Sequence, residues 1–518
     1  MAENITEIKN FSQITNARWY PRYHLAPPFG WCNDPNGFCF YKGEYHFFYQ
    51  HYPYEPQWGP MHWGHAVSKD LAYWKHLPIA LKPDQPYEIG GGCFSGSAIE
   101  KDGKLYLLYT AHFNRENSNE FAHSQSQCLA LSEDGVHFTK FPGNPIINVP
   151  ELPDIHGDDF RDPKVWKHDG KFYAVIGSRT PDENLGQALL FESDDLIHWT
   201  FKNISARTEG NLGRMWECPN FAEIDGQDVL IFSPMELDTS DGKFFNDKQA
   251  GVLIGKIDYA TGIFEHGDFQ HLDKGFDFYA PQIMQTPDGR TIMIGWMATW
   301  FFEMPESADG WAGQMTIPRE LHIKNGKIFS TPVKELKKLR KWKPVTYKNL
   351  LLKESTTLEG VEGDACELLL TIDAAKSKKF SIAVRASDDE KTVISYDAAD
   401  GTFTLDRTNS GVVFNNILPK EENPITYNLR EIKITPTNKL KLHIFIDRSS
   451  VEIFINDGAE VLSAKMYPQR TSQKIIFTPL DEVFAIKNVT LHKLDFGVPH
   501  PHIKSDPVNL KAEFPFLK

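Results

Sequence analysis

Short strands joined by glycine turns recur along the first two thirds of the chain. Each copy has a strand, a polar turn that ends in glycine, and a second strand rich in aromatic and aliphatic residues, as in "FSGSAIEKDGKLYLLYT" and "RDPKVWKHDGKFYAVIG". Two such runs around a glycine turn are typical of a β-hairpin. Five copies follow one another, and their turn glycines are Gly43, Gly103, Gly170, Gly226 and Gly289.

A second marker repeats with nearly the same spacing. The first four hairpins are followed by "SKDLAYW", "SEDGVHF", "SDDLIHW" and "DYATGIF", whose aspartates, Asp70, Asp134, Asp195 and Asp258, are 64, 61 and 63 residues apart. A period of that size with four short strands per copy is typical of propeller blades. The pattern therefore predicts a five-bladed β-propeller over residues 1–330, with a β-sandwich of coincidental spacing as the alternative.

The pattern changes after residue 330. The basic segment "TPVKELKKLRKWKP" predicts a helical connector over residues 331–344. From residue 345 to 518, alternating runs such as "KFSIAVRA" and "KNVTLHKL" predict an antiparallel β-sandwich. The expected fold class is all-β, with an N-terminal five-bladed β-propeller followed by a C-terminal β-sandwich.

Acidic residues occupy one phase of the propeller repeat. In a propeller, equivalent strand ends converge around the central channel, so residues at the same phase meet at one mouth. Three carboxylates, those of Asp34, Asp162 and Glu217, are therefore expected together. An isolated acid at a strand start is usually a turn former, but three at one phase indicate chemistry. Nine positions before the five turn glycines lie Asp34, Phe94, Arg161, Glu217 and Ala280, with Ser95, Asp162 and Tyr279 adjacent.

Composition and charge narrow the possible partners. The chain has 518 residues and a formal net charge of −14, which disfavours nucleic acid and anionic membranes as partners. It lacks an apolar run of about 18 residues, so no membrane span is expected. The first residues show no signal peptide and the six cysteines are scattered, which predicts a cytoplasmic location, or secretion if the sequence is a cloned mature form. Oligomeric state cannot be read from the sequence.

Several motifs resemble those of glycoside hydrolase family 32, which comprises invertases, fructanases and sucrose-6-phosphate hydrolases. "WCNDPNG" matches the W-M-N-D-P-N-G motif except for Cys32, "FRDPKVW" matches R-D-P, and "MWECPN" matches E-C. "FSGS", "FYAPQ" and, in the second domain, "IDRSSVEIFINDG" also fit. The resemblance implies that Asp34 is the nucleophile, Glu217 the general acid/base and Asp162 a transition-state stabiliser. The substrate-binding residues that it implies are Asn33, Gln50, Trp58, Phe94, Ser95, Arg161, Tyr279 and Trp296.

The reaction that the resemblance implies is the retaining hydrolysis of sucrose to glucose and fructose through a covalent fructosyl-enzyme. A small-molecule sugar is then the partner. Sucrose 6-phosphate or fructo-oligosaccharides are alternative substrates, and fructosyl transfer uses the same intermediate. An inverting pentosan glycosidase and a non-catalytic sugar-binding propeller are further alternatives.

The resemblance also gives expectations about ionisation. Asp162 is expected to be ionised beside Arg161, and Glu217 to be protonated near neutral pH because Trp216 and the anionic Asp34 raise its pKa.

Weaker signals suggest no further cofactor. His51, His62 and His65 are close in sequence, but no cysteine or carboxylate completes a metal site by spacing. Cys218 follows the acid/base residue without a histidine base placed for it by motif, so packing is the simpler interpretation. No metal and no cofactor are expected.

Overall fold

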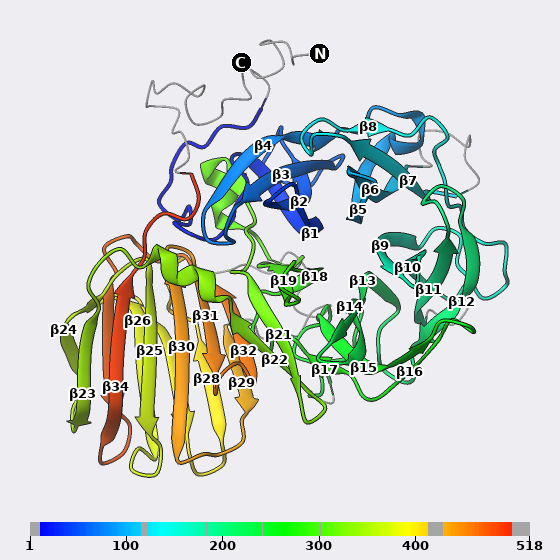
Figure 1. Cartoon of the computed structure of the whole chain (residues 1–518). Coiled ribbons are helices and arrows are strands. Elements are labelled where there is room, and N and C mark those ends of the chain that lie inside the picture. Colours follow the sequence, from blue (N-terminus) through cyan, green and yellow to red (C-terminus); the bar gives the residue numbers. More distant parts are fainter. Residues whose placement is uncertain are drawn as a thin grey trace.

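The computed structural model describes residues 11–114, 123–181, 185–240, 242–300, 302–412 and 428–499. Its strands form a ring of blades and, beside it, two stacked sheets (Figure 1). The helices in the described residues are short turns, namely η1 (Pro86–Glu88), η3 (Pro305–Asp309) and η4 (Lys334–Leu339). None of these described helices has the length and apolar character needed to cross a membrane.

Five antiparallel sheets form the propeller, so the predicted five-bladed architecture is confirmed. In each sheet the first hairpin has a turn that contains one of the repeated glycines, all of which have positive φ angles. The strands of blades one to three are β1 (Gly30–Tyr41), β2 (Glu44–Tyr52), β3 (His62–Ser68), β4 (Trp74–Leu81), β5 (Gly90–Lys101), β6 (Lys104–Phe113), β7 (Gln125–Ser132), β8 (Thr139–Lys140), β9 (Phe160–His168), β10 (Lys171–Arg179), β11 (Gly186–Ser193) and β12 (Thr200–Arg207). Those of blades four and five are β13 (Met215–Ile224), β14 (Gln227–Met235), β15 (Gly251–Asp258), β16 (Ile263–His266), β17 (Gln270–His271), β18 (Tyr279–Gln285), β19 (Thr291–Trp296), β21 (Arg319–Lys324) and β22 (Lys327–Pro332).

The ring closes at the innermost strand of blade one. The two-residue strand β20 (Trp311–Ala312) lies between β19 and β21 in sequence but pairs in parallel with the start of β1. Gly30 N–H also donates to the carbonyl of Gly310 at 3.1 Å. The last part of the propeller chain therefore holds the first strand of the propeller in place.

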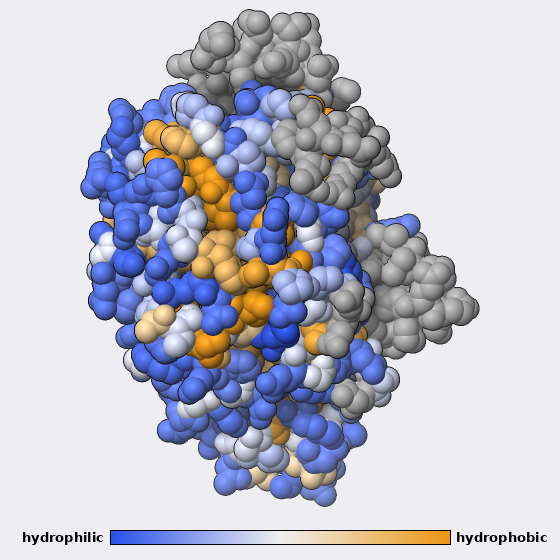
Figure 2. All heavy atoms as spheres, turned by 90° about the vertical axis from the view of Figure 1, so that its right-hand side faces the viewer, coloured by the Kyte–Doolittle hydropathy of each residue, from blue (hydrophilic) through white to orange (hydrophobic). Residues whose placement is uncertain are grey.

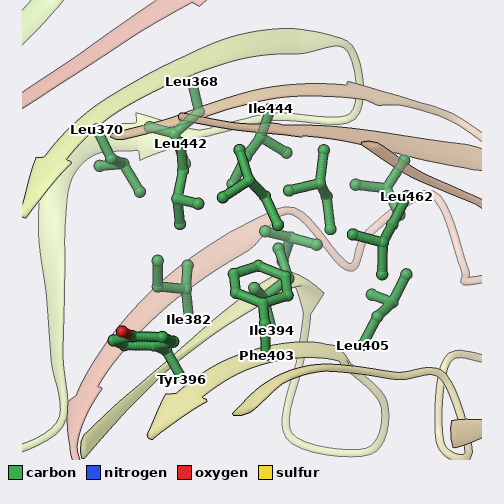
Figure 3. Close-up of a cluster of buried hydrophobic side chains, with 14 of the residues drawn as sticks. Leu368, Leu370, Ile382, Ile394, Tyr396, Phe403, Leu405, Leu442, Ile444 and Leu462 are labelled. Carbon is green, nitrogen blue, oxygen red and sulfur yellow. The ribbon is translucent and has the colours of Figure 1, made fainter. Parts of the chain in front are cut away.

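The second domain is the predicted β-sandwich, with two six-stranded antiparallel sheets. Their facing sides are apolar: Leu368 and Ile444 of one sheet point toward Ile382 and Phe403 of the other (Figure 3). Such alternation buries one face of every strand. The strands are β23 (Val345–Leu352), β24 (Thr356–Glu362), β25 (Cys366–Asp373), β26 (Lys379–Ala386), β27 (Thr392–Asp397), β28 (Thr402–Asp406), β29 (Leu429–Lys433), β30 (Lys439–Asp447), β31 (Ser450–Ile455), β32 (Glu460–Lys465), β33 (Lys474–Pro479) and β34 (Phe484–Lys493).

Fully buried charges join the propeller to the sandwich. His24 contacts Asp447 at 2.8 Å through Nδ1 and Glu452 at 2.9 Å through Nε2. Arg319 of blade five donates from Nε to Glu452 at 3.0 Å and from Nη1 to Asp273 at 2.9 Å. The outer surface of the propeller side is mostly polar. Hydrophilic residues cover most of the face in Figure 2, and hydrophobic residues form a central strip on it.

The domain limits drawn from the sequence stay a prediction. In the structure β22 ends at Pro332, η4 covers Lys334–Leu339 and β23 begins at Val345. Residues 1–10 and 500–518, which the predicted limits include, lie outside the described residues.

Candidate active site

The innermost strand of every blade is irregular at the same place. In blade one, Cys32 pairs with His51 and Pro35 with Tyr49, so Asn33 and Asp34 lie together opposite a single residue. This is a β-bulge, which turns side chains away from the regular alternation of a strand. Comparable register shifts follow Phe94 in β5, Arg161 in β9, Glu217 in β13 and Tyr279 in β18.

Three of these bulges hold a non-glycine residue in the left-handed backbone region. The φ angles are +66° at Asp162, +48° at Cys218 and +48° at Ala280. Side chains rarely adopt this conformation, and such strained residues concentrate at functional sites. Blades three, four and five therefore share one unusual backbone feature at the same mouth of the channel.

Two of the three predicted carboxylates flank the thiol of Cys218. Its Sγ lies 3.6 Å from Oδ2 of Asp34 and 3.7 Å from Oδ2 of Asp162. The Cys218 N–H donates to the same Asp162 oxygen at 2.9 Å. Asp34 is further held by Ser95, whose hydroxyl donates at 2.8 Å, and by the amide of Asn33 at 3.1 Å. The bulges thus gather acids that lie far apart in sequence.

The third carboxylate, Glu217, directly precedes Cys218 and is bound on both oxygens. Arg161 donates to Oε1 from Nη2 at 2.9 Å and from Nε at 3.3 Å, and the hydroxyl of Tyr279 donates to Oε2 at 2.5 Å. The side chain of Glu217 remains 18% exposed. Its carboxylate is therefore held by charge-assisted hydrogen bonds while keeping contact with solvent.

The surroundings move the three pKa values in different directions. Burial, and then the negative charge of Glu217, raise the pKa of Asp34. Burial also raises the pKa of Asp162 to about 7, because the charges of Glu217 and Asp34 add to burial and Arg161 opposes it only in part. Burial would raise the pKa of Glu217 too, but Arg161, Lys248 and the hydrogen bond from Tyr279 outweigh it, so that pKa is lowered.

This order of proton affinities reverses the one expected from the sequence. Arg161 lies 2.9 Å from Glu217 but 3.9 Å from Asp162. Its positive charge therefore favours ionisation of Glu217 more than that of Asp162, the opposite of what the sequence predicted. Trp216 is fully buried and stacks on Phe232 with ring centroids 4.0 Å apart. The expected directions of the two pKa shifts are therefore wrong for the protein in this conformation: the pKa of Glu217 is lowered and that of Asp162 is raised.

Four of the eight predicted substrate-binding residues contact the carboxylates directly: Asn33, Ser95, Arg161 and Tyr279. Two more form an aromatic rim. Phe94 is half-buried and stacks on His112 at 4.3 Å, and Trp58, 44% exposed, meets Phe94 edge-on at 6.3 Å. An exposed indole beside a polar pocket is suited to stacking on a sugar ring.

The remaining two residues, Gln50 and Trp296, lie behind this surface. Gln50 is 2% exposed and its amide donates to the carbonyl of Cys93 at 3.0 Å. Trp296 is fully buried and packs against Trp31 and Trp300, with ring centroids 6.1 and 5.0 Å away. In this structure these two side chains support the site from behind and do not form its open wall.

Sequence reasoning missed two residues beside the site, Asp159 and Arg179. Asp159 accepts from Nη1 of Arg161 at 2.7 Å and from Nε of Arg179 at 2.5 Å. The signal that could have found Asp159 is the second acid in "GDDFRDP", two residues before the arginine of the R-D-P motif.

The histidines near the site have protein partners. Nδ1 of His51 contacts the carbonyl of Trp31 at 2.8 Å, and Nδ1 of His62 contacts that of Pro60 at 2.9 Å. Burial lowers the pKa of both imidazoles, to about 4 and about 3. Among the residues that the structure describes, no group of three or more His, Cys, Asp and Glu side chains is arranged to hold a metal ion.

A separate cavity of about 620 Å³ occupies the other end of the channel. Its wall comes from the later part of the innermost strands, including Phe38, Ile99, Lys164, Ala222 and Met284. None of the three carboxylates lines it. This open volume and the chemistry therefore lie at opposite ends of the same strands.

Comparison with known proteins identifies the family. The model of the glycosyl hydrolases family 32 N-terminal domain matches residues 24–332, and that of the family 32 C-terminal domain matches residues 335–493. The chain belongs to glycoside hydrolase family 32. It is therefore a glycoside hydrolase, and the resemblance seen in its motifs is confirmed.

Individual relatives agree with this membership. A sucrose-6-phosphate hydrolase of Zymomonas mobilis is 38% identical over 480 residues, which span 89% of this chain and 90% of the relative. A raffinose invertase of Escherichia coli is 38% identical over 459 residues, 88% of this chain and 91% of the relative. Among solved structures, a mutant of a Bombyx mori GH32 β-fructofuranosidase in complex with sucrose has a TM-score of 0.81 and 33% identity, covering 96% of this chain and 98% of that one.

Proposed function

We propose that this family 32 enzyme is a retaining β-fructofuranosidase that cleaves sucrose into glucose and fructose. The observation that carries the proposal is the convergence of Asp34, Asp162 and Glu217, from three blades, around Cys218 at one channel mouth. Retaining glycosidases need one carboxylate to attack the sugar and one carboxylic acid to protonate the leaving oxygen. The named activities of the relatives support a fructoside as the substrate.

In the first step Asp34 attacks the anomeric carbon of the fructosyl unit and forms a covalent ester. Ser95 and Asn33 donate to its two oxygens and so fix the direction in which the carboxylate points. Glu217 gives its proton to the glycosidic oxygen, and glucose leaves. In the second step Glu217 takes a proton from water, which opens the ester and releases fructose.

Asp162 stabilises the positive charge that develops on the fructosyl ring. A fixed anion favours that charge more than the neutral substrate, which is what lowers the barrier. Sugar hydroxyls that donate to Asp162 favour its ionised form. Besides burial, the negative charge of Glu217 raises the pKa of Asp162, and this coupling is reciprocal. Ionisation of Asp162 on substrate binding therefore raises the pKa of Glu217 and favours the protonated form that the acid step needs.

The pH dependence of kcat follows from these roles, because kcat reports the enzyme–substrate complex, in which Asp162 is ionised and Glu217 holds the proton. Asp34 has to be ionised and Glu217 protonated, so the profile is a bell with an acid limb set by Asp34 and an alkaline limb set by Glu217. Because burial and Glu217 raise the pKa of Asp34, the acid limb lies above the ordinary aspartate range.

Sucrose is the substrate that we rank first, and sucrose 6-phosphate and short fructans share its fructosyl end. The two named relatives from bacteria are equally similar to this chain and differ in the sugar on the leaving side. Trp58 at the rim is the platform on which we place that leaving sugar, because it is exposed and next to Phe94.

The test is to incubate the purified protein with sucrose, sucrose 6-phosphate, raffinose and inulin and compare kcat/KM. We expect release of glucose from sucrose, with the β-anomer of fructose formed first in an NMR time course. Release of the inverted anomer would favour the inverting glycosidase, and binding without release would favour a sugar-binding propeller. Glu217→Ala should lose about 10³-fold on sucrose, an amount typical of general acid catalysis, and less on a fructoside with a phenolic leaving group.

A further inference from the structure

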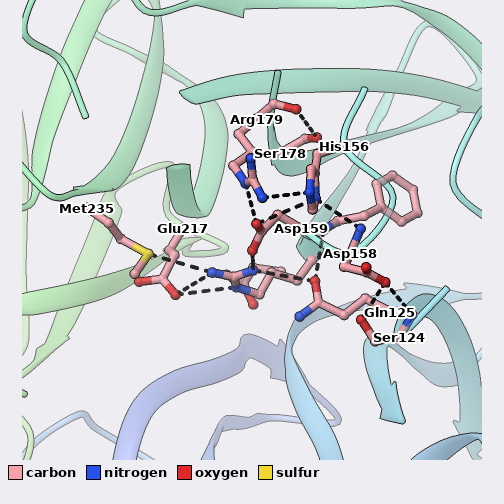
Figure 4. A network of polar contacts seen from close by, with 12 residues as sticks. Ser124, Gln125, His156, Asp158, Asp159, Ser178, Arg179, Glu217 and Met235 are labelled. Carbon is pink, nitrogen blue, oxygen red and sulfur yellow. Dashed lines mark hydrogen bonds and ion pairs between the residues drawn. The ribbon is translucent and has the colours of Figure 1, made fainter. Parts of the chain in front are cut away.

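A chain of alternating charges runs from Glu217 away from the carboxylate cluster. Glu217 pairs with Arg161, Arg161 with Asp159, and Asp159 with Arg179. Nη2 of Arg179 then contacts Nε2 of His156 at 2.6 Å. Figure 4 shows Arg179 of β10 and His156 of the loop before β9 beside Asp159, and Glu217 of β13 at the other end of the network.

Asp159 lies between two guanidinium groups. Its Oδ1 accepts from Arg161 at 2.7 Å and its Oδ2 from Arg179 at 2.5 Å. Burial, opposed by the charge of Arg161 and the hydrogen bond from Arg179, leaves the pKa of Asp159 well below its usual range. Asp159 is therefore a fixed anion at any pH near neutrality.

The other contact of Nη1, the nitrogen that bonds Asp159, is longer and uncharged: it reaches the amide oxygen of Gln125 at 3.4 Å. On the edge that faces Glu217, Nη2 also reaches Sδ of Met235 at 3.6 Å. Asp159 therefore supplies the short charged bond that orients the planar guanidinium, whose opposite edge is directed at Glu217.

We propose that Asp159 is a positioning residue, which holds Arg161 against Glu217 and thereby sets the upper pH limit of hydrolysis. This inference rests on the proposed function, in which Glu217 is the general acid/base. When Glu217 takes up its proton, the ion pair with Arg161 ends. Asp159 then keeps the guanidinium neutralised and in place, ready for the next ionisation.

Without the anion at position 159, the charge of Arg161 would be less neutralised and would act more strongly on Glu217, its nearest remaining carboxylate. A positive charge favours the ionised form of a neighbouring carboxyl, so Glu217 would lose its proton at lower pH. Every charged or titratable group that faces the pair enters this balance. Glu217 is faced by Arg161, Lys248, Tyr279, Asp34, Asp162 and Cys218, and Asp159 by Arg161, Arg179, His156 and His112.

The experiment is the pH profile of kcat, measured at saturating sucrose, for Asp159→Asn. We expect the alkaline limb to move to lower pH by about one unit, which is about a tenfold loss on that limb, and a much smaller loss below the optimum. Asp159→Glu keeps the negative charge, so its alkaline limb should lie close to that of the wild type. On a fructoside with a phenolic leaving group, which needs little protonation, Asp159→Asn should stay within about threefold of wild type.

The matched control is Asp228→Asn, which also removes a carboxylate from an ion pair in the propeller. Asp228 pairs with Lys256 at 3.0 Å and lines the cavity at the opposite mouth. Its substitution should leave both limbs where they are. If Asp159→Asn lowers activity equally at every pH, or leaves the limb unmoved, Asp159 only supports the fold and the proposal is overturned.

A second variant covers the case in which Asp159→Asn does not fold. Arg179→Gln removes the positive charge on the other side of Asp159, so the anion acts more strongly on Arg161 and Glu217 and the alkaline limb should move to higher pH. A limb that stays in place, or moves to lower pH, contradicts the proposal. Failure of the wild-type protein to cleave any fructoside would instead overturn the proposed function.

Discussion

Buried charge is used in opposite ways at the domain interface and at the channel mouth. At the interface, His24 contacts both Asp447 and Glu452, and the ionised forms of these groups are favoured over the neutral ones. The pKa of His24 rises to about 9 and that of Glu452 falls. At the mouth, Asp34, Asp162 and Glu217 gather around Cys218, and the guanidinium of Arg161 pairs closely with Glu217 alone of the three.

The pairing of charges explains the difference in chemistry. At the interface Asp447, Glu452 and Asp273 each contact a cation, and such pairs fix structure because breaking one leaves an uncompensated buried charge. At the mouth, burial and an excess of negative charge raise the pKa values of Asp34 and Asp162 toward neutrality. Groups that can exchange a proton near neutral pH are what an acid/base site requires. Both regions are buried, so burial alone does not distinguish a structural charge from a reactive one.

The largest contrast should come from the carboxylate that attacks the substrate. Asp34→Asn should lower kcat on sucrose by about 10⁴-fold, equivalent to about 5.5 kcal/mol of barrier, because an amide cannot form the ester. The melting temperature should stay the same or rise, since one of three neighbouring acids is removed. Glucose release and thermal unfolding measure the two effects. Activity within about tenfold of wild type would disprove the assignment of the nucleophile.

The converse result is expected at the interface. Glu452→Gln should destabilise the protein by about 4 kcal/mol, since it leaves His24 and Arg319 without their shared anion. In the fraction that remains folded, kcat should be close to wild type. Urea unfolding and steady-state kinetics on the same preparation provide the comparison. Loss of activity without loss of stability would mean that the two regions do not differ as described.

A pH dependence of stability should follow from His24. Its pKa is about 9 in the folded protein against an ordinary value of 6.5, so its stabilising contribution is complete below pH 6.5 and is lost as pH rises through 9. The shift corresponds to about 3 kcal/mol at most. Unfolding free energies measured between pH 6 and 10 should decline in the wild type, and His24→Asn should flatten the slope. An identical slope in the variant would show that another group is responsible.

The smallest effect is expected at the rim. Trp58→Ala should raise KM for sucrose about fivefold, the loss of about 1 kcal/mol of stacking, and leave kcat nearly unchanged. Trp342→Ala is a matched control, because Trp342 is similarly exposed, at 51%, but lies in the segment between the two domains. Equal effects of the two substitutions on KM would remove Trp58 from the binding surface.

Much of the architecture could be predicted because its causes are local in sequence. Turn glycines such as Gly103 and Gly170 adopt positive φ angles and mark each hairpin, and their spacing gives the number of blades. The same phase argument brought Asp34, Asp162 and Glu217 to one mouth. The roles of individual residues came from motif resemblance, not from periodicity.

The rest depends on distances that a sequence does not contain. Whether Arg161 favours Glu217 or Asp162 is decided by the difference between 2.9 and 3.9 Å, and that difference reversed the expected order of proton affinities. The burial of Gln50 and Trp296 depends on how their side chains pack against neighbouring strands. Asp159 and Arg179 were missed because their role comes from a network and not from a motif.

The closure of the ring by β20 has a consequence for biosynthesis. The strand that carries Asp34 is among the first to leave the ribosome, but its parallel partner, Trp311–Ala312, is synthesised only after four further blades have been translated in large part. Until then one edge of β1 lacks this partner, and unpaired strand edges invite association with other chains. A nascent chain that ends before residue 311 therefore lacks the pairing that holds the strand of Asp34. We expect hydrolysis only after the ring has closed.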